Sequence, residues 1–245
     1  VAIAASELAD AIPVAEEDVC ATTVWYVAGG QGTTQTPYFF QTAEAPGPTQ
    51  FATGYATGLV MDAIGATKAG YVTGPELDFS VITFNAWTAG MQQVNPDLES
   101  VATFTGSFDD SALGQEAAVS QLGQGVGILY PYLGGATDAV AAAGFEQGVL
   151  SVTPGTDRCA EEMFAVSSVF SPGDYFAAAL EDFAAGTVVL GITRVFVLGV
   201  DPVPTVKICG NVEGAEELQA ELDAMIAQIA AGEVDVDALT AAAAG

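Results

Sequence analysis

Two kinds of apolar segment alternate along this chain of 245 residues. Segments with apolar residues at helical spacing alternate with short runs rich in Val, Ile and Leu, and turn signals bound both kinds of segment. The expected helices are 4–12, 51–64, 80–93, 111–122, 136–143, 173–185 and 215–231. The expected strands are 22–27, 69–73, 100–105, 126–130, 149–152, 164–169, 194–198 and 206–208. Continuous apolar strands between helices predict an α/β fold with a parallel sheet covered on both faces.

Such a sheet has a predictable place for a ligand. Open parallel sheets bind ligands outside the carboxyl ends of their strands, at the point where the strand order reverses. No apolar stretch approaches the ~20 residues that span a bilayer, and no basic region marks a signal peptide at the start. We therefore expect a soluble segment, without a transmembrane span, whose binding residues follow the strands.

The charge of the chain excludes several classes of function. Thirty-one acidic residues face four basic residues, which gives a formal net charge of −27 without any histidine. Nucleic acids and anionic lipids bind patches of Lys and Arg that this chain lacks, so no nucleic acid partner is expected. Ser/His/Asp and Cys/His catalytic sets both need histidine, and no EF-hand loop is present. We therefore expect no enzymatic activity, no cofactor and no metal. Hydrophobic residues still make up 51% of the chain, enough for a folded core.

A series of short motifs resembles the basic membrane protein family of ABC-transporter substrate-binding lipoproteins. The motifs follow the family's order and spacing and extend from about Phe40 to Val236. They are Gly54–Leu59, Ala69–Gly74, Gly90–Met91, Val94–Asp97, Thr105–Asp110, Gly114–Ala118, Gly134–Gly135 and Thr156–Asp157. The block Gly106-Ser107-Phe108-Asp109-Asp110 is the most specific of them.

The resemblance implies a type I periplasmic-binding-protein fold, in which two Rossmann-like lobes with parallel sheets close over a ligand. In characterised members the ligand is usually a nucleoside. The implied partners are thus a small polar ligand and the permease of an ABC importer, and the implied role is delivery without chemistry. The implied location is extracellular or periplasmic, with membrane anchoring through a lipoprotein N-terminus that this chain does not contain. A sensor-type binding module is a further, weaker interpretation.

The resemblance also predicts how the chain is divided. Residues 1–50 are expected to be a remnant of the first lobe, residues 51–160 the second lobe, and residues 161–245 the returning crossovers and a C-terminal helix shared between the lobes. Val1 falls within the last helix of the family's first lobe, so we expect this lobe to be incomplete. The alternative function follows from the resulting open sheet edge: a structural or assembly protein, an extracellular homo-oligomer or filament, that keeps the fold and has lost the ligand site.

Two positions depart from the family's binding pattern. The family's acidic contact to a ribose lies in a Gly-Val-Asp-Ser-Asp-Gln type of turn, which here reads Pro154 to Arg158 and keeps the second acid, Asp157. The lysine that follows a Thr-Ser pair in the family has no counterpart in the stretch Ser167 to Ser171.

Five residues are candidate ligand contacts, and each has a structural alternative. Gly134 and Gly135 follow an expected strand, where glycine lets a ligand approach backbone amides or simply permits a turn before a helix. Asp157 ends a strand, where its carboxylate suits two ribose hydroxyls or the cap of a following helix. Trp87 and Tyr132 are expected either to stack on a base or to lie in the core.

The cysteines predict one disulfide. Cys159 and Cys209 each follow an expected strand at its end, so both are expected on the same rim of the sheet. Secreted proteins seldom leave exposed thiols free, which predicts a bond between these two residues. Cys20 stands before the first expected strand and is expected to be unpaired or bonded to a segment outside this chain.

Overall fold

The computed structural model describes residues 2–5, 18, 22–28 and 39–244. They form two compact units, and each unit is built from separate stretches of the chain. The first unit comprises the described part of 1–45 together with 170–204, and the second comprises 46–169 together with 205–245. The expected boundaries near 50 and 160 therefore fall several residues away from the observed ones. The C-terminal region is also not shared, because residues 205–245 belong entirely to the second unit.

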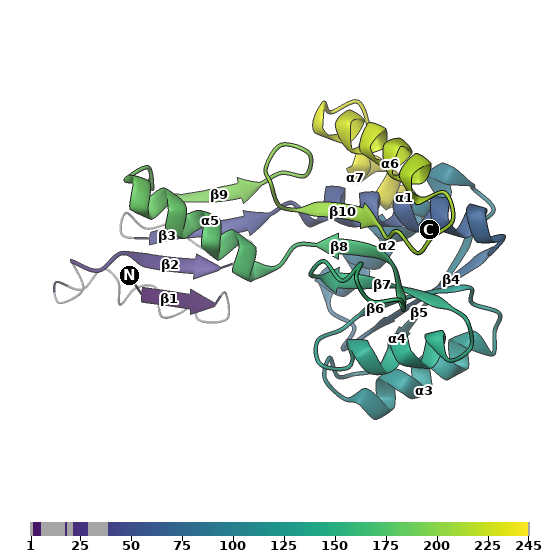
Figure 1. Ribbon diagram of the computed structural model, residues 1–245. Coiled ribbons are helices and arrows are strands. Elements are labelled where there is room, and N and C mark those ends of the chain that lie inside the picture. The colour runs from purple at the N-terminus through teal and green to yellow at the C-terminus, as the bar shows by residue number, and fades with distance from the viewer. Residues whose placement is uncertain (1, 6–17, 19–21, 29–38, 245) are drawn as a thin grey trace. The chain divides into compact units, whose positions relative to one another are not determined.

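The second unit is organised around a six-stranded sheet (Figure 1). Its strands are β4 (Lys68–Thr73), β5 (Glu99–Phe104), β6 (Ile128–Tyr132), β7 (Leu150–Gly155), β8 (Phe164–Val169) and β10 (Thr205–Ile208). Their order is β10-β8-β7-β6-β4-β5. Every neighbouring pair is parallel except β10 with β8, which is antiparallel. The expected parallel sheet is therefore confirmed for β4 to β8, while the edge strand β10 runs the other way.

Helices cover both faces of this sheet. They are α1 (Pro46–Ile64), α2 (Asp78–Val94), α3 (Ser111–Leu122) and α4 (Thr137–Phe145). Side chains alternate across a strand, so Val72 and Leu129 pack with residues of α3 and α4 on one face. The neighbouring Tyr71 and Tyr130 point to the other face, where their rings contact Trp87 of α2. This two-sided cover explains why the strands read as continuous apolar runs.

Helices α1 and α2 cross at backbone contact. A Cβ atom at Gly54 would lie 1.9 Å from the carbonyl oxygen of Trp87, and one at Gly90 would lie 2.0 Å from that of Phe51. Glycine is therefore required at both positions. Helices α6 (Ala215–Ala230) and α7 (Val236–Ala243) pack against this pair, with Phe51 and Val236 in one cluster. The sequence pattern did not predict α7, a short Ala-rich helix that Asp235 caps by accepting a hydrogen bond from the backbone N–H of Ala238.

The first unit has a smaller, fully parallel sheet. Its strands β1 (Ala2–Ala5), β2 (Trp25–Ala28), β3 (Phe39–Glu44) and β9 (Ile192–Phe196) are arranged in that order. Helix α5 (Pro172–Ala185) lies against β2 and β3 (Figure 1). Ser171 caps this helix by accepting a hydrogen bond from the Gly173 N–H, and Gly186 ends it with a left-handed backbone at φ 71°.

The described N-terminal residues form a strand and not the predicted helix. Residues 4–12 were expected to form a helix, yet Ala4 and Ala5 belong to strand β1, which pairs with β2. Alanine tolerates both structures, and pairing with a neighbouring strand decides between them. The rest of the expected helix lies outside the described residues, as does Cys20. Strand β3, which the pattern also missed, is the central strand that pairs with β2 and β9.

Candidate functional site

The strand order of the second unit places its ligand-binding edge. Strand β4 lies between β5 and β6, so the chain goes to one side of β4 for β5 and to the other side for β6. The reversal puts the topological switch point at the carboxyl ends of β4 and β6. The segments that follow β4, β5 and β6 therefore carry the residues best placed to contact a ligand.

Three aromatic side chains from these segments meet at the switch point, and we call them the aromatic rim: Phe79, Phe108 and Tyr132. The ring of Phe79 lies 6.0 Å from that of Phe108 with 19° between their planes, and 6.4 Å from that of Tyr132. Tyr132 in turn stacks on Tyr71, with ring centres 5.9 Å apart. Phe79 is 48% exposed, whereas Phe108 and Tyr132 are half-buried. The rim thus joins the buried aromatic core to the solvent.

Backbone contacts fix the segments that carry the rim. The Thr73 hydroxyl donates to the carbonyl oxygen of Tyr132 at 2.9 Å, and the Thr105 N–H donates to the carbonyl oxygen of Thr73 at 2.9 Å. A Cβ atom at Gly74 would lie 2.7 Å from the Phe108 ring. Glycine at the end of β4 therefore makes room for that ring, and the three strand ends hold the rim in one place.

Gly134 and Gly135 follow β6 as expected, but their amides already have partners. Gly134 N–H donates to the carbonyl oxygen of Phe108 at 3.0 Å, and Gly135 N–H donates to Asp109 Oδ1 at 2.7 Å. A Cβ atom at Gly134 would lie 2.7 Å from that same Asp109 oxygen. These glycines let the β5–α3 segment approach the start of α4, which favours the turn alternative.

Asp109 and Asp110 have different roles. Asp110 caps α3 by accepting hydrogen bonds from the N–H groups of Ala112 and Leu113 at 3.0 and 3.2 Å. Asp109 instead reaches Gly135, across the switch point. The helix cap therefore comes from the second member of this acidic pair.

Asp157 lies just after the carboxyl end of β7, and its carboxylate is held on both sides. One oxygen accepts a hydrogen bond from the Cys159 N–H at 3.1 Å, and the other pairs with Lys207 Nζ on β10. The hydrogen bond from Lys207 is the largest cause that lowers the pKa of Asp157, so this carboxylate remains charged well into the acidic range. Cys159 and Cys209 form a disulfide with Cα atoms 4.9 Å apart.

Trp87 lies away from this edge. Its side chain is fully buried, its indole N–H donates to the Thr57 hydroxyl at 3.0 Å, and its ring contacts Tyr71 and Tyr130. This placement fits the core alternative for Trp87. Of the two aromatic residues singled out from the sequence, Tyr132 is the one that reaches the switch point. The sequence did not predict Phe79 and Phe108 as ligand contacts, although each follows an expected strand.

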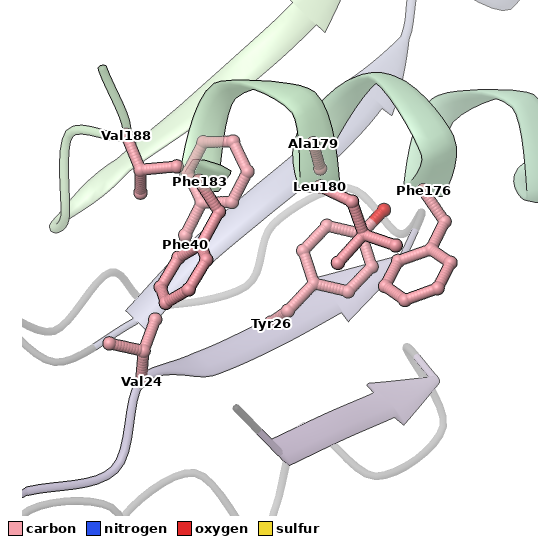
Figure 2. Close-up of a pocket in the computed structure, with 8 residues that line it drawn as sticks. All are labelled: Val24, Tyr26, Phe40, Phe176, Ala179, Leu180, Phe183 and Val188. Carbon is pink, nitrogen blue, oxygen red and sulfur yellow. The ribbon is translucent and has the colours of Figure 1, made fainter. Parts of the chain in front are cut away.

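An apolar pocket lies in the described part of the first unit, between α5 and strands β2 and β3. Figure 2 shows the side chains around it, among them Tyr26, Phe40 and Phe183. Its volume is about 20 Å³, far below the several hundred Å³ of a small-molecule site. Tyr26 and Phe40 belong to the core of this unit, so the pocket is a packing gap.

The described residues contain neither a metal-binding cluster nor a helix that could span a membrane. No group of three or more Cys, Asp or Glu side chains there is arranged to hold a metal ion. None of the helices in the same residues has the length and apolar character needed to cross a bilayer.

Comparisons with known proteins agree on the fold. The chain is similar in structure to an ABC transporter solute-binding protein from Conexibacter woesei, with a TM-score of 0.74 and 24% identity over 95% of this chain and 78% of the other. A transcriptional activator of the comK gene from Bacillus halodurans has a TM-score of 0.74 and 15% identity over 92% and 76%. A solute-binding protein of an ABC transporter system from Aeropyrum pernix has a TM-score of 0.70 and 16% identity over 98% and 68%. These likenesses show the type I periplasmic-binding-protein fold.

Sequence comparison adds the family. No curated protein matches the chain in sequence. Residues 38–204, more than half of the chain, match the family described as "Bmp: ABC transporter substrate-binding protein PnrA-like". This protein therefore belongs to the Bmp family of ABC transporter substrate-binding proteins.

Proposed function

We propose that this protein binds a nucleoside, or a similar small polar molecule with a planar ring, and delivers it to the permease of an ABC importer. Substrate-binding proteins of ABC transporters bind small molecules outside the cytoplasm and hand them to a permease without transforming them. The ligand class is the part of this proposal that the family match does not specify. The observation that carries it is the aromatic rim at the switch point.

The rim suits a flat, partly apolar ring. The planes of Phe79 and Phe108 are nearly parallel, so they form a surface of one orientation rather than a disordered apolar patch. Stacking of a base on an aromatic side chain contributes about 1–3 kcal/mol. Phe79 supplies the accessible part of this surface, because nearly half of its side chain is exposed.

The charges around the rim favour a neutral ligand. Asp109 and Asp110 follow β5, and Asp157 follows β7. The Gly135 amide at the start of α4, where an anion would otherwise bind, already holds the Asp109 carboxylate. A phosphorylated ligand would place a negative charge next to these carboxylates, which would repel it. A nucleoside is neutral, and its hydroxyl groups can donate hydrogen bonds to the carboxylates.

Thermal unfolding with added ligand tests this proposal. Adenosine, guanosine and inosine should raise the melting temperature with concentration, because a ligand that binds the folded state stabilises it by about 2.7 kcal/mol at one hundred times its Kd. Monosaccharides and the corresponding nucleoside monophosphates complete the panel. If no nucleoside shifts the transition at millimolar concentration, the proposed ligand class is wrong.

A matched pair of variants tests the rim itself. Phe79→Ala should weaken nucleoside binding by about tenfold or more, since it removes a stacking surface. Ile82→Ala is the control, because Ile82 is on the same helix and equally exposed, at 49% against 48%. Isothermal titration calorimetry of both variants gives the comparison. Equal losses in the two variants would contradict a role for the rim.

The proposed location is the outer face of a membrane, with anchoring through a lipidated N-terminus upstream of this chain. The disulfide between Cys159 and Cys209 supports an oxidising compartment. Phase partitioning of the native protein in detergent tests the anchor. A native protein that stays wholly in the aqueous phase would contradict it.

A further inference from the structure

The connection between β7 and β8 differs from its neighbours in the second unit. Helices α2, α3 and α4 link β4, β5, β6 and β7 in turn. Parallel strands normally need a crossover of about a dozen residues or more, usually a helix. Strands β7 and β8 are parallel, yet residues 156–163 join them without a helix. We call this stretch the β7–β8 connection.

Contacts with the strands beside it replace the missing helix. The disulfide ties Cys159 of the connection to Cys209, directly after β10. The Arg158 N–H donates to the Ser167 hydroxyl on β8 at 3.0 Å, and the Asn211 side chain donates to the carbonyl oxygen of Glu162 at 2.9 Å. The connection is thus bonded to β8, to β10 and to the residues after β10.

Two of the chain's four basic residues contribute to the same connection. Lys207 of β10 pairs with Asp157. Arg158 pairs with Glu161 at 2.6 Å and with Asp138 in the first turn of α4 at 2.5 Å, and its guanidinium lies 4.4 Å from the Phe164 ring centre. These two cations hold the carboxylates of Asp157, Glu161 and Asp138 at or beside the connection.

We infer that Lys207 and the Cys159–Cys209 disulfide are positioning residues, which hold Asp157 at the carboxyl edge as a ready hydrogen-bond acceptor for the ligand. The inference rests on the proposed function, because it assigns Asp157 to that ligand site. An exposed ion pair alone orients a side chain weakly. The disulfide at Cys159, two residues after Asp157, restrains the backbone of this segment, which the ion pair between Lys207 and Asp157 does not do.

The charged and polar groups around Asp157 affect its pKa, so their role in holding Asp157 can be tested without a ligand. Lys207 from β10 is its charged partner, the Cys159 N–H and the Ser167 hydroxyl are its neutral hydrogen-bond donors, and Arg158 beside it pairs with Asp138 and Glu161. Removal of the cation in Lys207→Met should raise the pKa of the Asp157 carboxyl group in a carbon-detected NMR titration. Lys207→Arg should restore it, because arginine keeps the charge.

The disulfide is tested by a double variant and by chemical reduction. Cys159→Ser/Cys209→Ser should lose amide hydrogen-exchange protection in residues 157–162 by about tenfold or more, while Cys20→Ser should not. Dithiothreitol should reproduce the loss in the unaltered protein. Its thiolate bonds to Cys159 Sγ, Cys209 leaves as a thiolate, and the second thiol of the reagent closes its ring and frees Cys159. Unchanged protection in the double variant and in the reduced protein would overturn the inference.

Ligand binding completes the test. Lys207→Met and the double variant should each bind the best nucleoside of the panel at least tenfold more weakly, with Lys207→Arg and Cys20→Ser close to the unaltered protein. If affinity stays unchanged while the Asp157 titration and the exchange pattern change, the positioning role is overturned and the proposed function stands. If the unaltered protein binds no nucleoside, the proposed function fails, and the Asp157 titration and hydrogen exchange still decide whether these residues hold Asp157 in place.

Discussion

The second unit covers both faces of its sheet with helices, whereas the described part of the first unit has one helix, α5, against four strands. The side chains reflect this difference. Eight large apolar residues are exposed in the described part of the first unit: Leu180, Phe183, Val189, Leu190, Ile192, Val195, Val197 and Val200. The second unit has about three times as many described residues and exposes seven: Ile64, Leu77, Phe79, Ile82, Leu113, Val119 and Phe145.

The second unit gives a binding site the more rigid support. The second unit buries its aromatic core, with Tyr71, Trp87 and Tyr130 fully enclosed, so the rim at its edge rests on a well-packed scaffold. The first unit buries fewer apolar side chains in its described part, and Tyr26, Phe40 and Ala179 form one cluster among them. We expect the stability of the two units to respond differently to mutation, pH and salt. The expected differences follow from the largest to the smallest.

The largest effect is expected at the crossing of α1 and α2. Gly54→Val should destabilise the second unit by about 4 kcal/mol or more, because even a Cβ atom there would overlap the Trp87 carbonyl. Near-UV circular dichroism during urea unfolding measures it. Gly173→Ala in the first unit is the control, since its Cβ would meet the Ser171 hydroxyl at an ordinary 3.4 Å. Similar midpoints for both variants would contradict the close crossing.

The first unit should show an unusual pH dependence. Burial is the largest cause that raises the pKa of Glu44 to about 7, while the Tyr175 hydroxyl donates to its carboxylate at 2.5 Å. The folded state therefore binds the proton more tightly than the unfolded chain, whose Glu pKa is near 4.5. This contribution is full below pH 4.5 and is lost as the pH rises through 7, by about 3 kcal/mol in total.

Glu44→Gln is the variant that isolates this effect. It keeps a side chain of the same size without the titrating group, so the fall in stability between pH 4.5 and 7 should become shallower. Unfolding of both proteins at several pH values gives the difference. Identical pH profiles would show that Glu44 titrates normally.

Salt should stabilise the second unit more than the first. The second unit holds 21 acidic and three basic residues, a net charge of −18, and the first holds 10 and one, a net charge of −9. Raising NaCl from about 0.01 M to about 1 M shortens the Debye length from ~30 Å to ~3 Å, which screens this repulsion. We expect a gain on the order of 1–2 kcal/mol. Midpoints that stay flat with salt would show that the charges are too widely spaced to matter.

The smallest expected effects come from a matched pair of helix caps. Asp110→Ala removes a cap that accepts two N–H groups in the second unit, and Ser171→Ala removes one that accepts a single N–H in the first. Each should cost about 1 kcal/mol, with Asp110 the larger. Denaturation midpoints measured for each variant compare them. A larger loss for Ser171→Ala would reverse this order.

Much of the local structure was decided by the sequence itself. The bounds expected for the helix 111–122 and the strand 164–169 are those of α3 and β8. The helix has clear end signals, because Asp110 precedes it and Gly123 follows it. The parallel arrangement of β4 to β7 followed from the alternation of helices and strands. These features depend on neighbours along the chain, so their signal is present in the residues themselves.

The tertiary structure decided what depends on partners far along the chain. The pattern of residues 39–44 is weak, and β3 exists because β2 and β9 flank it. From the sequence, Trp87 suits a ligand contact or the core, and the structure places it in the core, where Thr57 accepts its N–H. The amide of Gly135 looks open to a ligand until Asp109, 26 residues away, occupies it. The residue type determines which hydrogen bonds a group can make. The fold determines which partner lies within reach, because that partner can be far away in the sequence and buried polar groups are nearly always hydrogen-bonded.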